Sequence, residues 1–343
     1  MKKLTNDSKR HLEASAKKQL QNRVKRKNKT YHTKPASKPR STGIPVATRQ
    51  QIFFEELRAP VKFNLQYENC DEVVSYLARI KQMGNNGRNL NIRMDDIDEI
   101  GEGAIAMLLS VMDELSKQNV LIKGAKPKDP DVKDVLERSG FFKYMSGSVD
   151  EKNKNSKNTI LRTGGVNDSV INLPEEIRKA NDTVWGSTGR NPPMRGSVYE
   201  MMRNSCDHAF KDVDNIIWHL AISHDDSNNL VKFSFVDNGK GIIRSFRNGI
   251  LKAVKHLFTD NVDILNTAFR NGIESRTGLS WRGKGLPTIF ENYQDGYFKN
   301  LVVISNDVFI DFDRSLSKKL SVPFSGTYYF WVLNKDCVKA CYT

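Results

Sequence analysis

Three short motifs in the second half of the chain bring together residue types that could act on one ligand. The first is Glu200-x3-Asn204-x3-His208, whose spacings of four place the three side chains on one side of a predicted helix over 193–210. An amide oxygen such as that of Asn204 suits a hard cation such as Mg²⁺, and the Glu200 carboxylate one turn away could orient or deprotonate a water. Taken alone, the motif is more typical of an ordinary polar helix face.

The second motif is Asp-Asn-Gly-Lys-Gly at 237–241, which directly follows a predicted strand over 230–236. Gly239 and Gly241 permit backbone conformations closed to other residues and a close approach to a ligand. Asp237, at the strand end, could accept a hydrogen bond from an exocyclic amine. Because Asn-Gly after a strand is also a common hairpin signal, the motif alone describes a tight turn as well.

The third motif is Arg-Gly-Lys-Gly-Leu-Pro at 282–287, which is predicted to open a helix. Backbone N–H groups at a helix N-terminus with glycine beside them form phosphate sites, and Arg282 and Lys284 add positive charge. The motif is not a P-loop, because the G-x4-G-K-[ST] spacing is missing. A helix-capping turn accounts for it equally well.

The order of the three motifs resembles that of the GHKL superfamily of ATP-binding proteins, which includes gyrase, heat-shock chaperone ATPases, histidine kinases and MutL. The resemblance covers about residues 170–335. DNGKGI is similar to the histidine-kinase version, and E-x3-N-x3-H-A is nearer to that of the anti-sigma serine kinases. The resemblance implies bound ATP and Mg²⁺ in an α/β sandwich with helices on one face of a mixed sheet.

The resemblance also implies a role for each matching position. Asn204 would coordinate Mg²⁺, and Glu200 would be the general base or position the attacking water. Asp237 would bind the adenine amino group with Gly241 close to the base, and Thr327 would share a water with Asp237.

Further positions are assigned by the resemblance alone. The remaining ATP-binding positions are glycines and their neighbours in the second and third motifs: Gly239, Gly283, Lys284, Gly285 and Leu286. Residues 242–281 would form the ATP lid. His208 could have a catalytic role or simply pack and form hydrogen bonds, and the neighbouring Asp207 matches an acid of the chaperone and MutL branches.

The first globular part alternates predicted strands with predicted helices, which favours an α/β layer arrangement. The strands are expected over 61–65, 90–94 and 120–123, and the helices over 70–83, 103–118 and 131–139. The run from about residue 92 to 145, which contains L-x-x-S-G-F at a helix end, resembles a STAS domain, the fold of the anti-sigma antagonists.

Two kinds of phosphorylation switch are disfavoured. The phosphoacceptor serine of the STAS family would fall near Glu102 or Gly103, where there is no hydroxyl, because Ser110 lies well inside the helix. Glu102 could supply a fixed negative charge there, or it could be a plain surface residue at a helix start. Residues 146–192 contain no histidine, so a conventional two-component sensor kinase is disfavoured as well.

The predicted elements of the second part follow the same reasoning. Beyond the helix over 193–210, strands are expected over 216–223, 230–236, 301–305, 308–312 and 327–333, with helical sequence over about 244–271 and after 287. The polar stretch 147–168 is predicted to be a linker. The whole chain is therefore expected to be an α+β protein with a basic arm (1–50), a STAS-like domain (51–146), the linker, a GHKL-type domain (169–335) and a tail (336–343).

The charge is concentrated at one end of the chain. The 343 residues include 54 Lys or Arg and 40 Asp or Glu, a net charge of +14, yet residues 1–50 alone hold 15 basic and two acidic side chains. We expect this arm to be disordered in isolation, because it offers little apolar surface for burial. It could attract nucleic-acid phosphates or an acidic protein, or serve only as a solvated tail, and too few apolar positions recur to indicate a membrane surface.

The composition is that of an ordinary globular protein of the cytoplasm. Hydrophobic residues make up 38% and charged residues 27%, and no apolar run approaches the roughly 18 residues of a membrane helix. The N-terminus lacks the apolar stretch of a secretory signal. The four cysteines support neither a disulfide framework nor a zinc site: Cys70, Cys206, Cys337 and Cys341.

These features predict a Mg²⁺-dependent ATP-binding regulatory protein that hydrolyses ATP slowly or passes the phosphoryl group to another protein. The STAS-like domain would contact an unidentified protein partner. The alternative is a non-catalytic module whose binding or assembly is gated by ATP, acting on nucleic acid through the arm. A homodimer is suggested only by analogy with the superfamily.

Overall fold

The computed structural model describes residues 52–139, 141, 157–162, 172–208, 218–250, 260–271 and 285–340. All of them belong to one compact unit, residues 52–343. The basic arm lies outside the described residues. For description we divide the unit into an N-lobe, the described residues from 52 to 141, and a C-lobe, those from 157 to 340.

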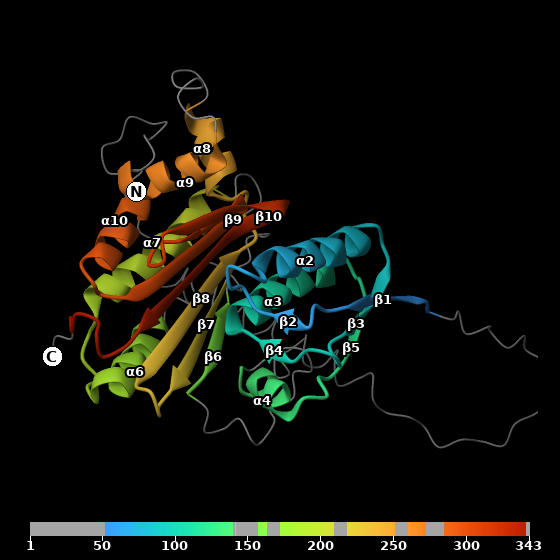
Figure 1. The fold of residues 1–343 in the computed structure, drawn as a ribbon, viewed down its shortest axis with the longest axis horizontal. Helices are drawn as coiled ribbons and strands as arrows, with labels where there is room; N and C mark the ends of the chain where they lie inside the picture. The colour runs from blue at the N-terminus through green and yellow to red at the C-terminus, as the bar shows by residue number, and fades with distance from the viewer. Residues whose placement is uncertain are drawn as a thin grey trace, which may run out of the picture. The chain divides into compact units, whose positions relative to one another are not determined.

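The C-lobe is organised around a five-stranded sheet in which every pair of neighbours is antiparallel (Figure 1). Its strands, in spatial order, are β6 (Thr159–Arg162), β7 (Trp218–Asp225), β8 (Leu230–Asp237), β10 (Leu316–Leu333) and β9 (Lys299–Asp311). Side chains alternate between the two faces along each strand, so that Phe233 and Phe235 of β8 enter one core and Val236 enters another.

Five helices pack against the face that carries Phe233. They are α6 (Leu173–Trp185), α7 (Pro192–His208), α8 (Ile242–Ile250), α9 (Asn261–Asn271) and α10 (Gly285–Gln294). Aromatic rings fill the space between helices and sheet, and the rings of Phe233 and Trp331 stack with their centroids 5.2 Å apart. This core holds α7 and α10, which carry the first and third motifs, on the same side of the sheet.

The N-lobe packs against the opposite face of that sheet (Figure 1). It contains a parallel three-stranded sheet in the order β1 (Phe54–Arg58), β3 (Asn89–Arg93) and β5 (Ile122–Ala125), and a two-stranded pair, β2 (Lys62–Phe63) and β4 (Glu99–Ile100). Its helices are α2 (Cys70–Asn85), α3 (Glu102–Ser116) and α4 (Pro130–Arg138).

Helix α3 is the element that joins the lobes. A helix that is apolar on all sides is buried on all sides, and every residue of α3 from Gly103 to Met112 is buried. The approach to the sheet is close, because a Cβ at Gly103 would lie 2.0 Å from the hydroxyl oxygen of Tyr328 on β10. Polar contacts also join the two lobes. His219 Nε2 lies 3.0 Å from Asp113 Oδ2 of α3, and Lys81 Nζ of α2 donates to Ser325 Oγ over 2.7 Å.

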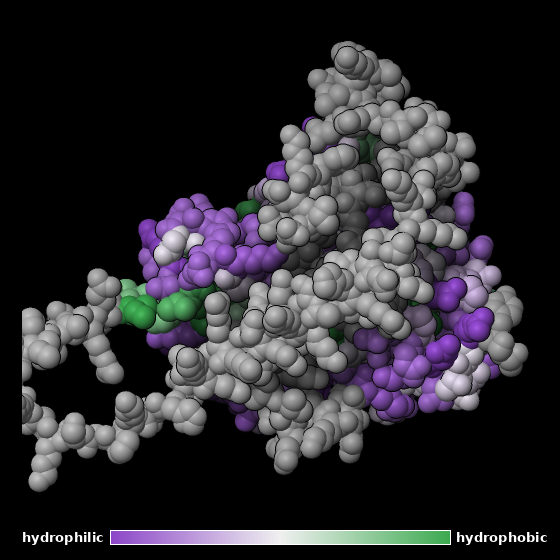
Figure 2. Space-filling model, turned by 180° about the vertical axis from the view of Figure 1, so that it is seen from behind, coloured by the Kyte–Doolittle hydropathy of each residue, from purple (hydrophilic) through white to green (hydrophobic). Residues whose placement is uncertain are grey.

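Most of the described surface seen in Figure 2 is hydrophilic, with one apolar patch at the start of β1. Ile52 and Phe53 are 55% and 79% exposed there. None of the described helices is long and apolar enough to cross a membrane.

The α+β class predicted from the sequence is confirmed. The mixed sheet expected for the C-terminal domain is not found, because every described pair of neighbouring strands in that sheet is antiparallel. The predicted elements of both lobes also differ in several details. Strand 61–65 is only the two-residue β2, while β1, β4, β6 and α6 were not predicted. The predicted linker 147–168 contains β6, an edge strand of the large sheet. The two strands expected over 301–305 and 308–312 are one strand, β9, in which Asn306 takes a left-handed backbone conformation (φ 54°) without ending the strand.

Candidate functional site

Asp237, the last residue of β8, has a buried carboxylate held by three donors. Its Oδ1 accepts from the backbone N–H groups of Gly239 (2.8 Å) and Thr327 (3.3 Å), and its Oδ2 accepts from Ser205 Oγ (3.1 Å). Burial raises the pKa of this carboxyl to about 6, and the hydrogen bonds oppose that rise. The group is therefore oriented and largely ionised at neutral pH.

The backbone around Asp237 is packed so closely that glycine is required beside it. Gly326 adopts a φ of +131°, and a Cβ there would lie 2.0 Å from the Asp237 carbonyl oxygen. Gly241 adopts a φ of +80°, and a Cβ there would lie 2.5 Å from Asn306 Oδ1. Neighbouring groups thus leave no room for a side chain at Gly241 in the second motif or at Gly326 on β10 beside it.

Asn306 fixes the loop that follows Asp237. Its Nδ2 donates to the carbonyl of Lys240 (2.8 Å), and its Oδ1 accepts from the N–H of Arg244 (3.2 Å). The neighbouring Ser305 Oγ accepts from the N–H of Ile242 (2.7 Å), so β9 also positions the start of α8. Sequence reasoning missed both residues, although a polar pair inside an otherwise apolar strand was a signal that could have identified them.

The first and third motifs meet where the start of α10 crosses α7. A Cβ at Gly285 would lie 2.5 Å from Glu200 Oε2 and 3.3 Å from Asn204 Oδ1. Glu200 and Asn204 are one turn apart on α7, as the spacing of four predicted. Gly285 and Leu286 are both buried at this crossing.

Two polar atoms at this crossing have no hydrogen-bond partner among the described residues. They are Glu200 Oε2 and Asn204 Nδ2, and both are buried. Glu200 Oε2 also forms an ion pair with Arg203 Nη2 at 2.5 Å, and the Asn204 side chain interacts with the Tyr329 hydroxyl. Arg203 thus meets part of the bonding capacity of Glu200, and Tyr329 part of that of Asn204, and the capacity left over could bond to a ligand.

The second motif is connected to the other two by adjacent residues. Ser205, next to Asn204 on α7, donates a hydrogen bond to Asp237. Thr327, which bonds to Asp237, and Tyr329, which interacts with Asn204, both lie on β10. The structure therefore brings Glu200, Asn204, Asp237 and Gly285 into one region of the C-lobe. Ser205 and Tyr329 were missed by the sequence reasoning.

Some predicted site residues cannot be placed. Gly283 and Lys284, together with Arg282, lie outside the described residues, as does much of the proposed lid over 242–281. The described parts of that segment are α8 and α9, whose apolar faces enter the core of the C-lobe. His208 is the last residue of α7, and its side chain lies outside the described part of the structure.

The described residues contain no group of three or more His, Cys, Asp or Glu side chains that could hold a metal ion. A cation at Asn204 would therefore depend on one amide oxygen, waters and the oxygens of a bound ligand, which is a common way for proteins to hold Mg²⁺. The Asn204 amide oxygen is of the ligand type that Mg²⁺ accepts.

Glu102, which the sequence left open between two roles, contributes to the contact between the lobes. Its Oε1 accepts from Ser223 Oγ (3.1 Å) and pairs with Lys232 Nζ (3.6 Å), both on the C-lobe sheet. It starts α3 and is partly covered by those partners. Its negative charge therefore contributes to the contact between the two lobes.

Comparison with known protein families and with curated proteins found no match to this chain.

Proposed function

We propose that the chain is a Mg²⁺-dependent ATP-binding regulatory protein that hydrolyses ATP slowly or passes its phosphoryl group to a protein. The observation that carries this proposal is the convergence of three sequence-distant features: the buried Asp237 carboxylate, the Glu200 and Asn204 side chains one turn apart on α7, and the glycine that opens α10. Each has the chemistry that a different part of ATP requires.

Asp237 would recognise the adenine ring. An ionised carboxylate only accepts hydrogen bonds, so it favours the exocyclic amine of adenine over the carbonyl oxygen that guanine carries at the same ring position. The donors Gly239, Thr327 and Ser205 fix the carboxylate before the base arrives. The resemblance would place Gly241 close to the base. The site should prefer ATP to GTP.

Asn204 would hold Mg²⁺ and α10 would hold the phosphates. The positive end of a helix attracts phosphate, and the start of α10 lies directly against Asn204. Gly283, Lys284, Gly285 and Leu286 would surround the phosphate chain, as the resemblance implies. Bound Mg²⁺ would offset the negative charge of the phosphates.

Glu200 would act on the group that attacks the terminal phosphate. Its Oε2 lies beside the start of α10, where the phosphates would be, and pairs there with Arg203 Nη2 at 2.5 Å. A carboxylate in this place can orient a water or a protein hydroxyl and accept its proton.

The N-lobe would carry the regulatory output. Helix α2 contacts β10, the strand that contains Thr327, and helix α3 contacts β7 and also β8, the strand that ends at Asp237. Lys81 of α2 bonds to Ser325, two residues before Thr327. A nucleotide bound at Asp237 would thus bias a lobe contact that a protein partner of the STAS-like lobe could sense. The arm over 1–50 would add attraction to nucleic acid or to an acidic partner.

The fate of the γ-phosphate tests this proposal. ATP labelled at that phosphate would be incubated with the full chain, with and without cell extract, and compared with Glu200→Gln and with a control, Glu291→Gln, an exposed carboxylate on α10. We expect slow release of phosphate or labelling of a protein, lost in Glu200→Gln and kept in the control. Unchanged turnover in Glu200→Gln would refute the role of Glu200. Bound but unconsumed ATP in the wild type would favour the non-catalytic alternative.

A further inference from the structure

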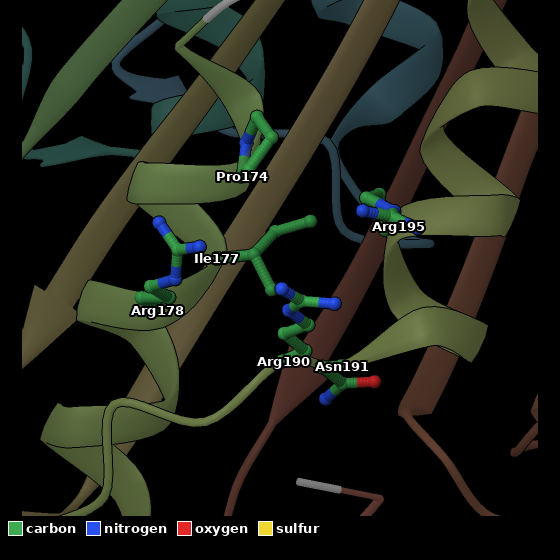
Figure 3. A pocket seen from close by; sticks show the side chains of 6 residues that line it. All are labelled: Pro174, Ile177, Arg178, Arg190, Asn191 and Arg195. Atoms are coloured by element: carbon green, nitrogen blue, oxygen red, sulfur yellow. The ribbon is translucent and has the colours of Figure 1, made fainter. Parts of the chain in front are cut away.

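A pocket in the C-lobe lies between α6 and α7 and is bordered by three arginines (Figure 3). Its volume is about 310 Å³, at the small end of ligand pockets. The lining residues are Pro174, Ile177, Arg178, Arg190, Asn191 and Arg195. Figure 3 shows Ile177 in the middle of this group, with the arginine side chains around it.

The charge of this pocket is poorly balanced by the residues that the structure describes. Arg178 pairs with Glu175 (3.2 Å), but neither Arg190 nor Arg195 forms an ion pair with any described residue. Helix α7 begins at this pocket and has no acidic residue in its first turn, so its positive end adds to the guanidinium charges. An anion bound here would relieve the repulsion among these groups.

The loop that carries Arg190 is fixed by two buried amides. Asn181 is fully buried, and its Nδ2 donates to the carbonyl of Gly189 (2.7 Å). Asn191 is 2% exposed; its Nδ2 donates to Asn181 Oδ1 (3.2 Å) and its Oδ1 caps α7 by accepting from the N–H of Met194 (3.2 Å). The backbone positions of the arginines are therefore set before any ligand binds, which lowers the entropy cost of binding.

Backbone groups at the start of α7 are not available to a ligand. Pro192 and Pro193 have no N–H, and the N–H groups of Met194 and Arg195 are bonded to Asn191. Recognition would thus depend on the guanidinium groups, which bind carboxylate and phosphate through paired N–H donors, and on the apolar surface of Pro174 and Ile177.

This pocket is distinct from the site around Asp237. Asn204 is nine residues beyond Arg195 on α7, which corresponds to about 13 Å along the helix axis. No residue that lines the pocket belongs to the three motifs.

We propose that this pocket binds a small polyanion, a molecule with two or more carboxylate or phosphate groups held by Arg178, Arg190 and Arg195. This goes beyond the proposed ATP site and does not depend on it. The carboxylate and phosphate sources share one chemistry, and separate titrations distinguish them.

The test is calorimetric titration of the full chain with pyrophosphate and, separately, with citrate at low ionic strength. We expect at least one of them to bind, and Arg190→Ala and Arg195→Ala each to weaken that binding by about tenfold or more. Arg190→Lys, which keeps the charge and loses the paired donors, should lie between Arg190→Ala and the wild type. The probe that binds, pyrophosphate or citrate, identifies whether the pocket takes phosphate or carboxylate groups.

One control variant and a folding check separate this pocket from other anion sites. Arg88→Ala removes an exposed arginine that pairs with Glu55. This variant should leave pyrophosphate and citrate binding unchanged. Each variant is checked for folding by its thermal unfolding curve. Absence of binding by either probe in the millimolar range, or binding that survives in the Arg190→Ala/Arg195→Ala double variant, would overturn the proposal, since the second result would assign the anion to the basic arm or to the ATP site.

Discussion

Gly285, the first residue of α10, lies so close to Glu200 of α7 that a Cβ at position 285 would stand 2.5 Å from Glu200 Oε2. Real Cβ atoms do not approach an oxygen this closely, so any side chain at 285 would displace the carboxylate. The third motif therefore needs glycine here because of the first motif, although 85 residues separate Gly285 from Glu200 in the chain. The packing of α7 against α10 therefore brings the first and third motifs together.

Replacing Gly285 with alanine should damage function and leave the fold intact. The atom in the way is the end of a flexible side chain, which can rotate, so the free energy of unfolding should change by less than about 1 kcal/mol. The rotated Glu200 carboxylate would leave the start of α10, so we expect ATP turnover to fall by about tenfold or more. Turnover and urea unfolding measure the two effects.

Gly196→Ala provides the matched control for that substitution. Gly196 lies within α7, and a Cβ there would meet nothing within 4 Å. Alanine favours a helix interior by roughly 0.5–1 kcal/mol over glycine, so this variant should be slightly more stable and should turn ATP over normally. Normal turnover in Gly285→Ala would show that the position of Glu200 does not matter.

Asp237→Asn should stabilise the protein in a pH-dependent way. The folded pKa of this carboxyl, about 6, lies above its ordinary value of 3.8, so the folded protein favours the protonated form and loses stability as pH rises from about 4 to 6. Asparagine carries no charge and keeps Oδ1 as the acceptor for Gly239 and Thr327. Its stabilising effect should be near zero at pH 4 and about 2–3 kcal/mol at pH 7, where the charged form is buried.

Chemical unfolding of the wild type and the asparagine variant at a series of pH values measures this difference. Other titrating groups are common to both proteins and cancel. A constant difference between pH 4 and pH 8 would mean that burial does not raise the Asp237 pKa. A gain in stability together with a loss of ATP binding would show that the buried charge is kept for the ligand.

Gly103→Ala should weaken the packing of the N-lobe against the C-lobe sheet. Its Cβ would lie 2.0 Å from the Tyr328 hydroxyl oxygen and 2.8 Å from Cζ, both in a rigid ring between packed strands. Overpacking of this kind costs about 1–3 kcal/mol. Tyr328→Phe removes the nearer atom at the cost of a long hydrogen bond to Ser234, 3.5 Å in length.

The double variant Gly103→Ala/Tyr328→Phe should therefore be more stable than the sum of the single effects predicts, by about 1 kcal/mol. Urea unfolding of the four proteins gives this coupling energy. Strict additivity would mean that α3 does not approach β10 at this point.

The motifs of the site could be predicted because helical spacing and strand ends are local properties. Glu200 and Asn204 share a helix face by their separation alone, and Asp237 ends a strand whose alternating pattern is plain in the sequence. Ser205 and Asn306 could not be predicted, because their roles arise from contacts across 32 and more than 60 residues of chain.

The fold was predicted least well where tertiary packing overrides the local pattern. The polar stretch around β6 reads as a linker, yet Thr159–Arg162 pairs with β7 and gains its backbone hydrogen bonds there. The sequence predicted a helix over 103–118. The full burial of the observed helix, α3, between the two lobes depends on β7 and β8 of a distant segment.

Equilibrium binding of ATP with Mg²⁺ or with EDTA, to the wild type, Asn204→Ala and Asp237→Asn, tests the central claim most directly. We predict that Mg²⁺ tightens ATP binding to the wild type, that Asn204→Ala loses this effect of Mg²⁺ and keeps the affinity seen in EDTA, and that Asp237→Asn binds ATP at least about tenfold more weakly in both conditions. ATP affinity that is the same in all three proteins, or no measurable affinity in the wild type, would contradict an ATP site at Asp237 and Asn204.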